Sequence, residues 1–208
     1  MATRRYEQRQ RAEAAEQTRR RILDAVIERL RKAPADPVSI DQIAEMADVA
    51  RSTVYAIFGS RAGLFDAVAA DVLEREGYER LLEAKLEPDA REHMRAGFRS
   101  GTDMLAADRD IVRALFSMAQ LDERAAADAV RKREASRAAG MTRLARRLEE
   151  QGLLRPDVSV EDAEHILWVL TSFESFDLLY TGRGLSVDEV ADILTATAER
   201  ALLAVRLS

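Results

Sequence analysis

The 208-residue sequence is 47% hydrophobic, contains no cysteine and has a formal net charge of −5. This length and composition support one large folded domain or a small domain joined to a larger one, and they exclude disulfides and thiolate metal sites. The absence of a secretory signal and of a run of about eighteen apolar residues predicts a soluble, cytoplasmic protein without a membrane span.

Positive charge is concentrated toward the N-terminal end of the chain. Residues 1–62 contain 12 Arg and Lys against 9 Asp and Glu, whereas the rest of the chain contains 20 against 28. A basic segment attached to an acidic body is typical of a DNA-binding domain joined to a sensing or dimerisation domain. A solvated charged tail would give the same charges, so this distribution alone leaves both interpretations open.

The first 13 residues are polar and rich in Arg, Gln and Glu, and we expect them to form a flexible arm. A helix is predicted over residues 14–32, because the apolar side chains from Ile22 to Leu30 recur on one face. Pro34 and Pro37 end this helix, since proline cannot continue a helix.

Residues 39–64 predict two short helices joined by a tight turn and followed by the start of a third. Ser39 can cap the first helix, and Gln42 has the spacing of a capping box. Asp48 interrupts the apolar pattern at the turn, and Ala50 opens the second short helix. A short helix held across a supporting helix is what a protein needs to place side chains in the major groove of DNA.

Several residues of this segment have a characteristic set of spacings, namely Ser39, Ile43, Ala44, Ala47, Val49, Thr53, Tyr55, Phe58, Arg61 and Leu64. This pattern resembles the DNA-binding domain of TetR-family transcriptional regulators. The sequence departs from the family pattern at Asp48, which replaces the usual turn glycine, at Ala50, which replaces a hydroxyl cap, at Ala56, which replaces a basic residue, and at Arg61, which replaces Lys. Asp tolerates a left-handed backbone better than most residues.

The resemblance implies that the second short helix enters the major groove. The DNA-binding residues expected on this basis are Ser39, Arg51, Ser52, Thr53, Tyr55 and Arg61. Arg51 can contact a guanine edge through two hydrogen bonds or bind a phosphate. Tyr55 can bind a phosphate or pack in the core. Because this helix has little positive charge, we expect Arg4 and Arg5 of the arm to contact DNA, unless the arm only aids solubility.

The rest of the sequence also predicts helices. Ser60 can cap a long helix over residues 61–86, which would link the two domains. Ser159 with Asp162, and Ser186 with Glu189, have capping-box spacing. The further helices are predicted over residues 90–106, 109–120, 123–151, 160–180 and from 187 nearly to the C-terminus.

The predicted fold is therefore all-α, with about nine helices. We expect residues 1–13 to form the basic arm, residues 14–62 the helix-turn-helix DNA-binding domain, and residues 63–208 a helical ligand-binding and dimerisation domain. In similar proteins the last two long helices pair with a second subunit, and the apolar content of residues 160–180 and 187–206 suits this role. A single-chain core would be the alternative.

Large, adaptable apolar side chains suit a pocket for a small apolar or amphipathic effector. The candidate ligand-binding residues are Met94, Phe98, Phe116, Met118, Met141, Trp168, Phe173 and Phe176. Core packing would explain each of them as well. Glu174 and Asp177 lie among the same apolar residues, as polar groups of a pocket or of a dimer rim. Gly97 and Gly101, inside a predicted helix, would allow either close helix contact or local softness.

Catalysis finds no support in the sequence. His93 and His165 are the only histidines, and the spacing of His165 to Glu161 predicts an ordinary surface pair rather than a metal site. Catalytic residues, a bound metal and a cofactor are therefore not expected. The resemblance implies a homodimeric regulator, more often a repressor than an activator, that binds a palindromic operator in double-stranded DNA and is released by a small organic effector. A DNA-binding protein that acts through protein partners is the alternative, and a helical enzyme or carrier is a third.

Overall fold

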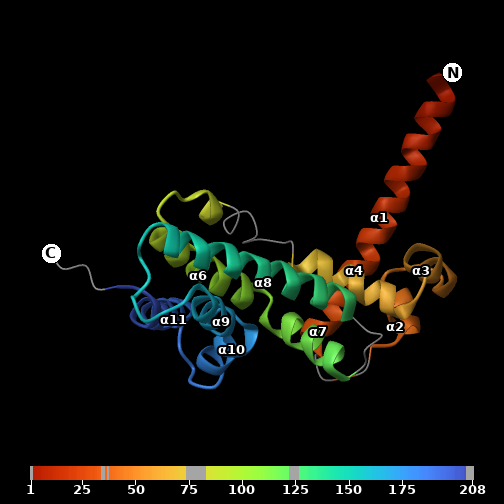
Figure 1. The fold of residues 1–208 in the computed structure, drawn as a ribbon. Coiled ribbons are helices and arrows are strands. Elements are labelled where there is room, and N and C mark those ends of the chain that lie inside the picture. Colours follow the sequence, from red (N-terminus) through yellow and green to blue (C-terminus); the bar gives the residue numbers. More distant parts are fainter. Residues whose placement is uncertain (1, 34–35, 37, 74–82, 122–126, 205–208) are drawn as a thin grey trace. The chain divides into compact units, whose positions relative to one another are not determined.

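The computed structural model describes residues 2–33, 36, 38–73, 83–121 and 127–204. Within these ranges the chain is built from α-helices (Figure 1), so the predicted all-α class is confirmed. The helices are α1 (Ala2–Lys32), α2 (Ile40–Met46), α3 (Arg51–Phe58), α4 (Arg61–Leu73), α6 (Ala90–Ala107), α7 (Arg109–Leu121), α8 (Ala127–Glu150), α9 (Val160–Leu170), α10 (Phe173–Tyr180) and α11 (Val187–Leu202).

The chain divides into two compact units. Unit 1 comprises residues 1–73 and 110–131, and unit 2 comprises residues 74–109 and 132–208. Unit 1 therefore contains α4 and most of α7 in addition to the segment predicted as the DNA-binding domain. Of the helix predicted over residues 61–86, the structure describes α4 and a helical turn at residues 83–86, and residues 74–82 lie outside the described part.

The core of unit 1 forms where α1 packs against α2 and α4, and α3 packs against α4. The fully buried side chains of this core include Ile22 on α1, Ile43 on α2 and Phe65 on α4. At the surface, Arg20 of α1 donates to Asp71 of α4 at 2.7 Å. Helices α2 and α3 are too short to be stable alone, and these contacts hold them in place.

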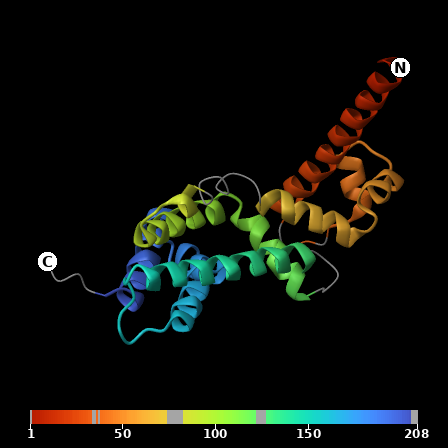
Figure 2. The same ribbon diagram turned by 45° about the horizontal axis from the view of Figure 1, so that its top comes forward.

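Helix α1 is longer than the sequence predicts. It begins at Ala2 rather than near residue 14, so most of the segment expected to be a flexible arm is helical. Arg9 and Glu13, spaced one helical turn apart, form an ion pair at 2.9 Å that favours this conformation. In Figures 1 and 2 the first part of α1 extends beyond the other helices of unit 1.

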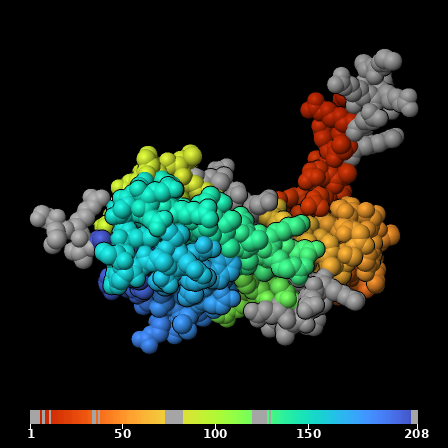
Figure 3. Space-filling view, viewed as in Figure 1, coloured from red at the N-terminus to blue at the C-terminus, as the bar shows by residue number. Residues whose placement is uncertain are grey.

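In unit 2, α11 packs against α6, α9 and α10. Figure 3 shows α8, α9 and α10 together on one face of this unit. The two predicted capping boxes are confirmed, because Ser159 with Asp162 begins α9, and Ser186 with Glu189 begins α11. These reciprocal bonds satisfy the free N–H groups at each helix start.

The end of α8 also follows the sequence prediction. Gly152 has a φ of +63°, the left-handed conformation that glycine adopts at low cost. The N–H of Leu153 bonds to the carbonyl of Leu148, and the N–H of Gly152 bonds to that of Glu149. This hydrogen-bond pair is the Schellman motif that commonly ends a helix.

The prediction of a single helix over residues 160–180 is wrong, since the helix is interrupted between α9 and α10 at Thr171 and Ser172. Hydroxyl side chains add hydrogen bonds to carbonyls at the end of α9, which also accept backbone N–H groups. The Thr171 hydroxyl donates to Leu167 O at 2.7 Å, and the Ser175 hydroxyl donates to Val169 O at 2.7 Å. Ser172 caps α10 by accepting from the N–H of Ser175.

Among the helices of the described residues, none has both the length and the apolar character that a bilayer crossing requires.

Candidate nucleic-acid interface

The turn between α2 and α3 is a helix C-cap built around Asp48. Asp48 has a φ of +53°. This left-handed conformation is the one expected for a residue at the position where the family pattern has glycine. Its N–H bonds to the carbonyl of Glu45 at 3.1 Å, and the N–H of Val49 bonds to that of Ala44 at 2.9 Å. These two bonds form a second Schellman motif. The motif reverses the chain within a few residues and so sets α3 across α2.

The start of α2 is capped differently from the prediction. Ser39 is the N-cap and accepts from the N–H of Asp41 at 3.3 Å. The side chain of Gln42 does not complete a capping box with Ser39. Its Oε1 instead accepts from Nε of Arg29 at 3.1 Å, and Arg29 also donates to the carbonyl of Ala33 at 2.8 Å. The buried Arg29 thereby ties the end of α1 to the supporting helix α2.

Helix α3 begins at Arg51, and its N-cap Ala50 offers no side-chain acceptor for the first N–H groups. Its end is fixed by Gly59, with a φ of +73°, and by Ser60. Ser60 caps α4 as predicted, because its hydroxyl accepts from the N–H of Gly63 at 3.0 Å. A Cβ added to Gly63 would lie 2.2 Å from the carbonyl oxygen of Phe58, so only glycine fits this close approach of α4 to α3.

The exposed side of α3 carries most of the predicted contact residues. Arg51 and Ser52 are exposed, Tyr55 retains 37% of its accessible surface, and Thr53 is half-buried. Val54 faces inward and is 1% exposed. The alternative that Tyr55 is a core residue is therefore not supported, since its exposure matches that of a surface residue beside Arg51.

Arg51 is held by two partners before any nucleic acid is present. Its Nη1 donates to both carboxylate oxygens of Asp41 on α2, at 2.8 and 2.9 Å. Its Nη2 lies 3.5 Å from the Tyr55 hydroxyl, and its Cζ lies 5.6 Å from the centre of the Tyr55 ring. The Tyr55 hydroxyl and the Asp41 carboxylate raise the pKa of Arg51 above its ordinary value. Asp41 is not among the DNA-contact residues predicted from the sequence.

The other predicted contact residues lie at helix starts. Ser39 is exposed at the N-cap of α2. Arg61 is the first residue of α4, and its guanidinium lies over the ring of Phe65, 4.9 Å from the ring centre. Arg4 and Arg5 belong to the first turns of α1, and their side chains lie outside the described part of the structure. Helix starts carry free N–H groups that favour phosphate.

The predicted ligand-binding residues are divided between the two units. Phe116 and Met118 are on α7 in unit 1, whereas the other six belong to unit 2: Met94, Phe98, Met141, Trp168, Phe173 and Phe176. In unit 2 the members on α6 and α10 are buried in the core, and the members on α8 and α9 are half-buried. An added Cβ at Gly97 or Gly101 would meet nothing within 4 Å, so close helix contact does not explain these two glycines.

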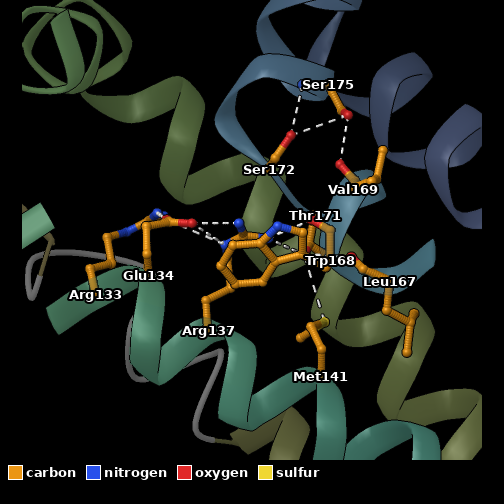
Figure 4. A network of polar contacts seen from close by, with 10 residues as sticks. All are labelled: Arg133, Glu134, Arg137, Met141, Leu167, Trp168, Val169, Thr171, Ser172 and Ser175. Carbon is orange, nitrogen blue, oxygen red and sulfur yellow. Dashed lines mark hydrogen bonds and ion pairs between the residues drawn. The ribbon is translucent and has the colours of Figure 1, made fainter. Parts of the chain in front are cut away.

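A network of polar contacts joins α8 to the break between α9 and α10 (Figure 4). Arg137 of α8 donates from Nη1 to the carbonyl of Trp168 at 2.6 Å and to the hydroxyl of Thr171 at 3.0 Å. It also pairs with Glu134 in the previous turn of α8. Burial lowers the pKa of the neighbouring Arg133 below its ordinary value. Charged groups are thus brought close to the half-buried Trp168.

The remaining charged candidates of unit 2 form ordinary pairs. Asp177 accepts from Nε of Arg109 at 2.9 Å and from the Thr181 hydroxyl at 2.7 Å. His165 lies 3.8 Å from Glu161, and both are exposed, as expected for a surface pair.

Comparison with known proteins relates this architecture to one family. Residues 22–68 match the family described as bacterial regulatory proteins, tetR family. These residues cover the last part of α1, the α2–α3 pair and the first half of α4. The match therefore spans the helix-turn-helix and its supporting helices. No curated protein matches this sequence.

Solved structures share the fold over nearly the whole chain. The structure of NalD, described as the secondary repressor of the MexAB-OprM multidrug efflux pump in Pseudomonas aeruginosa, is 23% identical and has a TM-score of 0.71 over 91% of this chain and 98% of its own. A TetR family transcription regulator from Marinobacter aquaeolei VT8 is 18% identical, with a TM-score of 0.67 over 94% and 98%.

A TetR-like transcriptional regulator from Rhodococcus sp. RHA1 is 22% identical, with a TM-score of 0.66 over 88% of this chain and 94% of its own. Likeness at this level of identity establishes the fold. The resemblance drawn from the spacing of residues 39–64 is thus confirmed: residues 22–68 form a TetR-family helix-turn-helix domain, and the chain has the fold of TetR-family transcriptional regulators.

Proposed function

We propose that this protein is a cytoplasmic, homodimeric repressor that binds a palindromic operator and leaves it when a small organic effector binds. The observation that carries the proposal is the surface of α3, where Arg51, Ser52 and Tyr55 are exposed on a helix set across α2. Such a helix can enter a major groove, with side-chain donors reaching base edges and phosphates. Ser39 and Arg61, at the starts of α2 and α4, would add phosphate contacts.

The apolar surface of unit 2 supports the homodimer. Val169 on α9, Leu178 on α10 and Ile193 on α11 are 57%, 69% and 43% exposed. Large apolar side chains on neighbouring helices are typical of a surface that pairs with another subunit. A two-fold dimer through α9, α10 and α11 would present two copies of α3 to successive major grooves on one side of the duplex. The operator would then be a near-palindrome with half-sites about one turn apart.

The effector part of the proposal is supported by the half-buried Met141 and Trp168 and by the buried Phe173 and Phe176 of the same unit. Adaptable Met and flat aromatic side chains suit a small apolar or amphipathic molecule. Such a molecule would release DNA if it bound more tightly to a conformation in which the two α3 helices have the wrong spacing. NalD, which shares the fold, is described as a repressor of an efflux pump.

Selection of duplexes from a random pool by the full-length protein tests the DNA-binding proposal. We expect one enriched sequence with near-palindromic half-sites, bound by two chains in sedimentation or light scattering. Enrichment of no sequence at low salt would contradict the proposal. Enrichment of an asymmetric site bound by a single chain would contradict the dimer.

A second candidate is a DNA-binding regulator that acts through a protein partner and senses no small molecule. It is favoured by the burial of Met94, Phe98, Phe173 and Phe176, which are 7% exposed or less and can all be core residues. A thermal-shift screen of apolar and amphipathic compounds, followed by operator release, distinguishes the two. A compound that both raises the melting temperature and releases the operator supports the effector, whereas a screen in which none does so favours the partner.

A further inference from the structure

Asp41 is the residue of the helix-turn-helix whose position the DNA-binding proposal leaves unexplained. It lies in the first turn of α2, its side chain is 65% exposed, and it forms an ion pair across to α3 with Arg51. An acidic side chain at this place is unfavourable for binding a polyanion, because it repels the phosphates. A carboxylate in the first turn favours the helix dipole only modestly, and an exposed ion pair adds little to folding stability, so the fold accounts for only a small part of the choice of Asp41.

The charge balance of the motif makes the pair more notable. Residues 39–62 contain three acidic residues, Asp41, Glu45 and Asp48, and two basic ones, Arg51 and Arg61. Arg51 is thus the one cation within α3, and its charge is already compensated by Asp41. The recognition helix therefore offers little general attraction to phosphates, and its single cation is committed to a fixed position.

The way in which Asp41 binds Arg51 leaves part of the guanidinium available. Both carboxylate oxygens bond to the same nitrogen, Nη1, while Nη2 lies near the Tyr55 hydroxyl at the longer distance of 3.5 Å. The Nε and Nη2 donors form an edge that Asp41 does not occupy. An edge with two parallel donors matches the O6 and N7 acceptors of guanine.

We propose that Asp41 is a positioning residue that restricts Arg51 to reading a guanine and prevents it from serving as a phosphate clamp. The inference rests on the proposed DNA-binding function and names the recognition made by that site. Asp41 repels a phosphate that approaches Arg51, whereas the neutral guanine edge carries no such penalty. Asp41 also holds the guanidinium against the Tyr55 ring, so that less side-chain freedom is lost when the base contact forms. Asp41 thus weakens binding to other DNA sequences and also favours the base contact at the correct site.

Two substitutions on α2 separate this role from a general effect of charge. Asp41→Asn keeps the size of the side chain and one acceptor but removes the charge. Glu45→Gln removes the same charge from another exposed residue of α2, one helical turn beyond Asp41, and it is the matched control. Arg51→Ala and the double variant Asp41→Asn with Arg51→Ala complete a double-mutant cycle.

The measurement is the dissociation constant for the duplex that the wild-type chain selects and for a mixed-sequence duplex of equal length, over a range of salt concentrations. For Asp41→Asn we expect tighter binding to the mixed-sequence duplex, with a salt slope steeper by about one per chain, because Arg51 is free to contact a phosphate. The ratio of the two constants should fall roughly tenfold or more relative to Glu45→Gln. In the Arg51→Ala background, Asp41→Asn should no longer change this ratio.

A modified base adds a readout that folding does not affect. In the selected duplex, replacing each guanine in turn by 7-deazaguanine removes the N7 acceptor. At one guanine position, the replacement should weaken binding of the duplex by the wild-type chain but leave the affinity of the Arg51→Ala variant unchanged. The inference is overturned if Asp41→Asn behaves as Glu45→Gln does, or if its effect persists in the Arg51→Ala background. Selection of no duplex by the wild-type chain would instead overturn the proposed DNA-binding function, and this inference with it.

Discussion

The guanidinium of Arg137 lies over the indole ring of Trp168, with its Cζ 3.6 Å from the ring centre. The same guanidinium donates to the Trp168 carbonyl, which the break between α9 and α10 has released from its helix. One side chain of α8 therefore fixes both the aromatic ring and the backbone at the end of α9. This contact supports the position of α10, where the predicted ligand-binding residues Phe173 and Phe176 lie.

Substituting Arg137 should destabilise unit 2. Arg137→Ala removes the ring contact and the hydrogen bonds to the α9 end, so we expect the free energy of unfolding to fall by about 2–3 kcal/mol. Arg137→Lys keeps the charge but not the planar fork, and should recover less than half of the loss. Denaturant unfolding followed by the fluorescence of Trp168, the single tryptophan, measures both. Arg131→Ala, an exposed residue of α8, is the control and should change little.

Substitution by alanine should have opposite effects on stability at Gly63 and at Gly97. Gly63→Ala places a Cβ against the Phe58 carbonyl and should destabilise the protein by about 1–3 kcal/mol, because backbone has to move. Gly97→Ala, inside α6 with free space around the new methyl group, should stabilise it by up to about 1 kcal/mol. Thermal unfolding of both variants gives the comparison, and equal effects would contradict the close approach of α4 to α3.

His93 predicts a pH dependence of stability. Its Nδ1 lies 2.8 Å from Nη1 of Arg147 and accepts a hydrogen bond from it, since arginine can only donate. Burial, followed by the charges of Arg147, Lys85 and Arg143, lowers the pKa of His93 from 6.5 to about 4. The unfolded chain therefore binds a proton more readily than the folded one between these values, and the stability should fall as the pH decreases from 6.5 toward 4.

His93→Asn keeps an acceptor for Arg147 but cannot be protonated in this range. We expect the unfolding midpoint of this variant to decrease less than that of the wild type as the pH falls from 6.5 to 4. His165→Asn, at the exposed second histidine, is the control and should keep the wild-type profile. A wild-type profile in His93→Asn would mean that His93 is not held neutral in the folded protein.

The sequence predicts structure best where a few neighbouring residues determine it. The capping boxes at Ser159 and Ser186 and the end of the helix predicted to stop at residue 151 depend on residues within about one helix turn, and the structure contains all three. The left-handed turn at Asp48 belongs to the same class. Local hydrogen bonds of this kind are set by residue type and spacing.

Contacts between different helices could not be predicted from residue type and spacing in the same way. Periodicity continues through Thr171 and Ser172, and the break there is completed by Arg137 from α8, 31 residues from Trp168 in the chain. Gln42 has the spacing of a capping-box residue but is drawn to Arg29 of α1. Asp41 meets Arg51 only because the turn brings α2 and α3 together, so the pair could not be predicted from spacing.

The N-terminal part of α1 should contribute to operator affinity. Four arginines, Arg4, Arg5, Arg9 and Arg11, occupy its first turns and would add contacts to phosphates or the minor groove. Replacing all four with Gln keeps the helix length and should weaken operator binding and flatten its salt dependence. Four glutamine replacements of exposed arginines in unit 2 provide the control. Unchanged affinity and slope would mean that this segment only aids solubility.

The most direct test of the account is the operator affinity of the double variant Arg51→Ala with Tyr55→Ala. Both side chains are exposed, so the variant should keep the circular dichroism spectrum and melting temperature of the wild type. The control Arg183→Ala removes one exposed cation from unit 2. By fluorescence anisotropy with the selected duplex, we predict that the folded double variant loses roughly a hundredfold or more in affinity, while the control binds as the wild type does. Full affinity in the double variant would contradict the assignment of α3 as the DNA-reading helix.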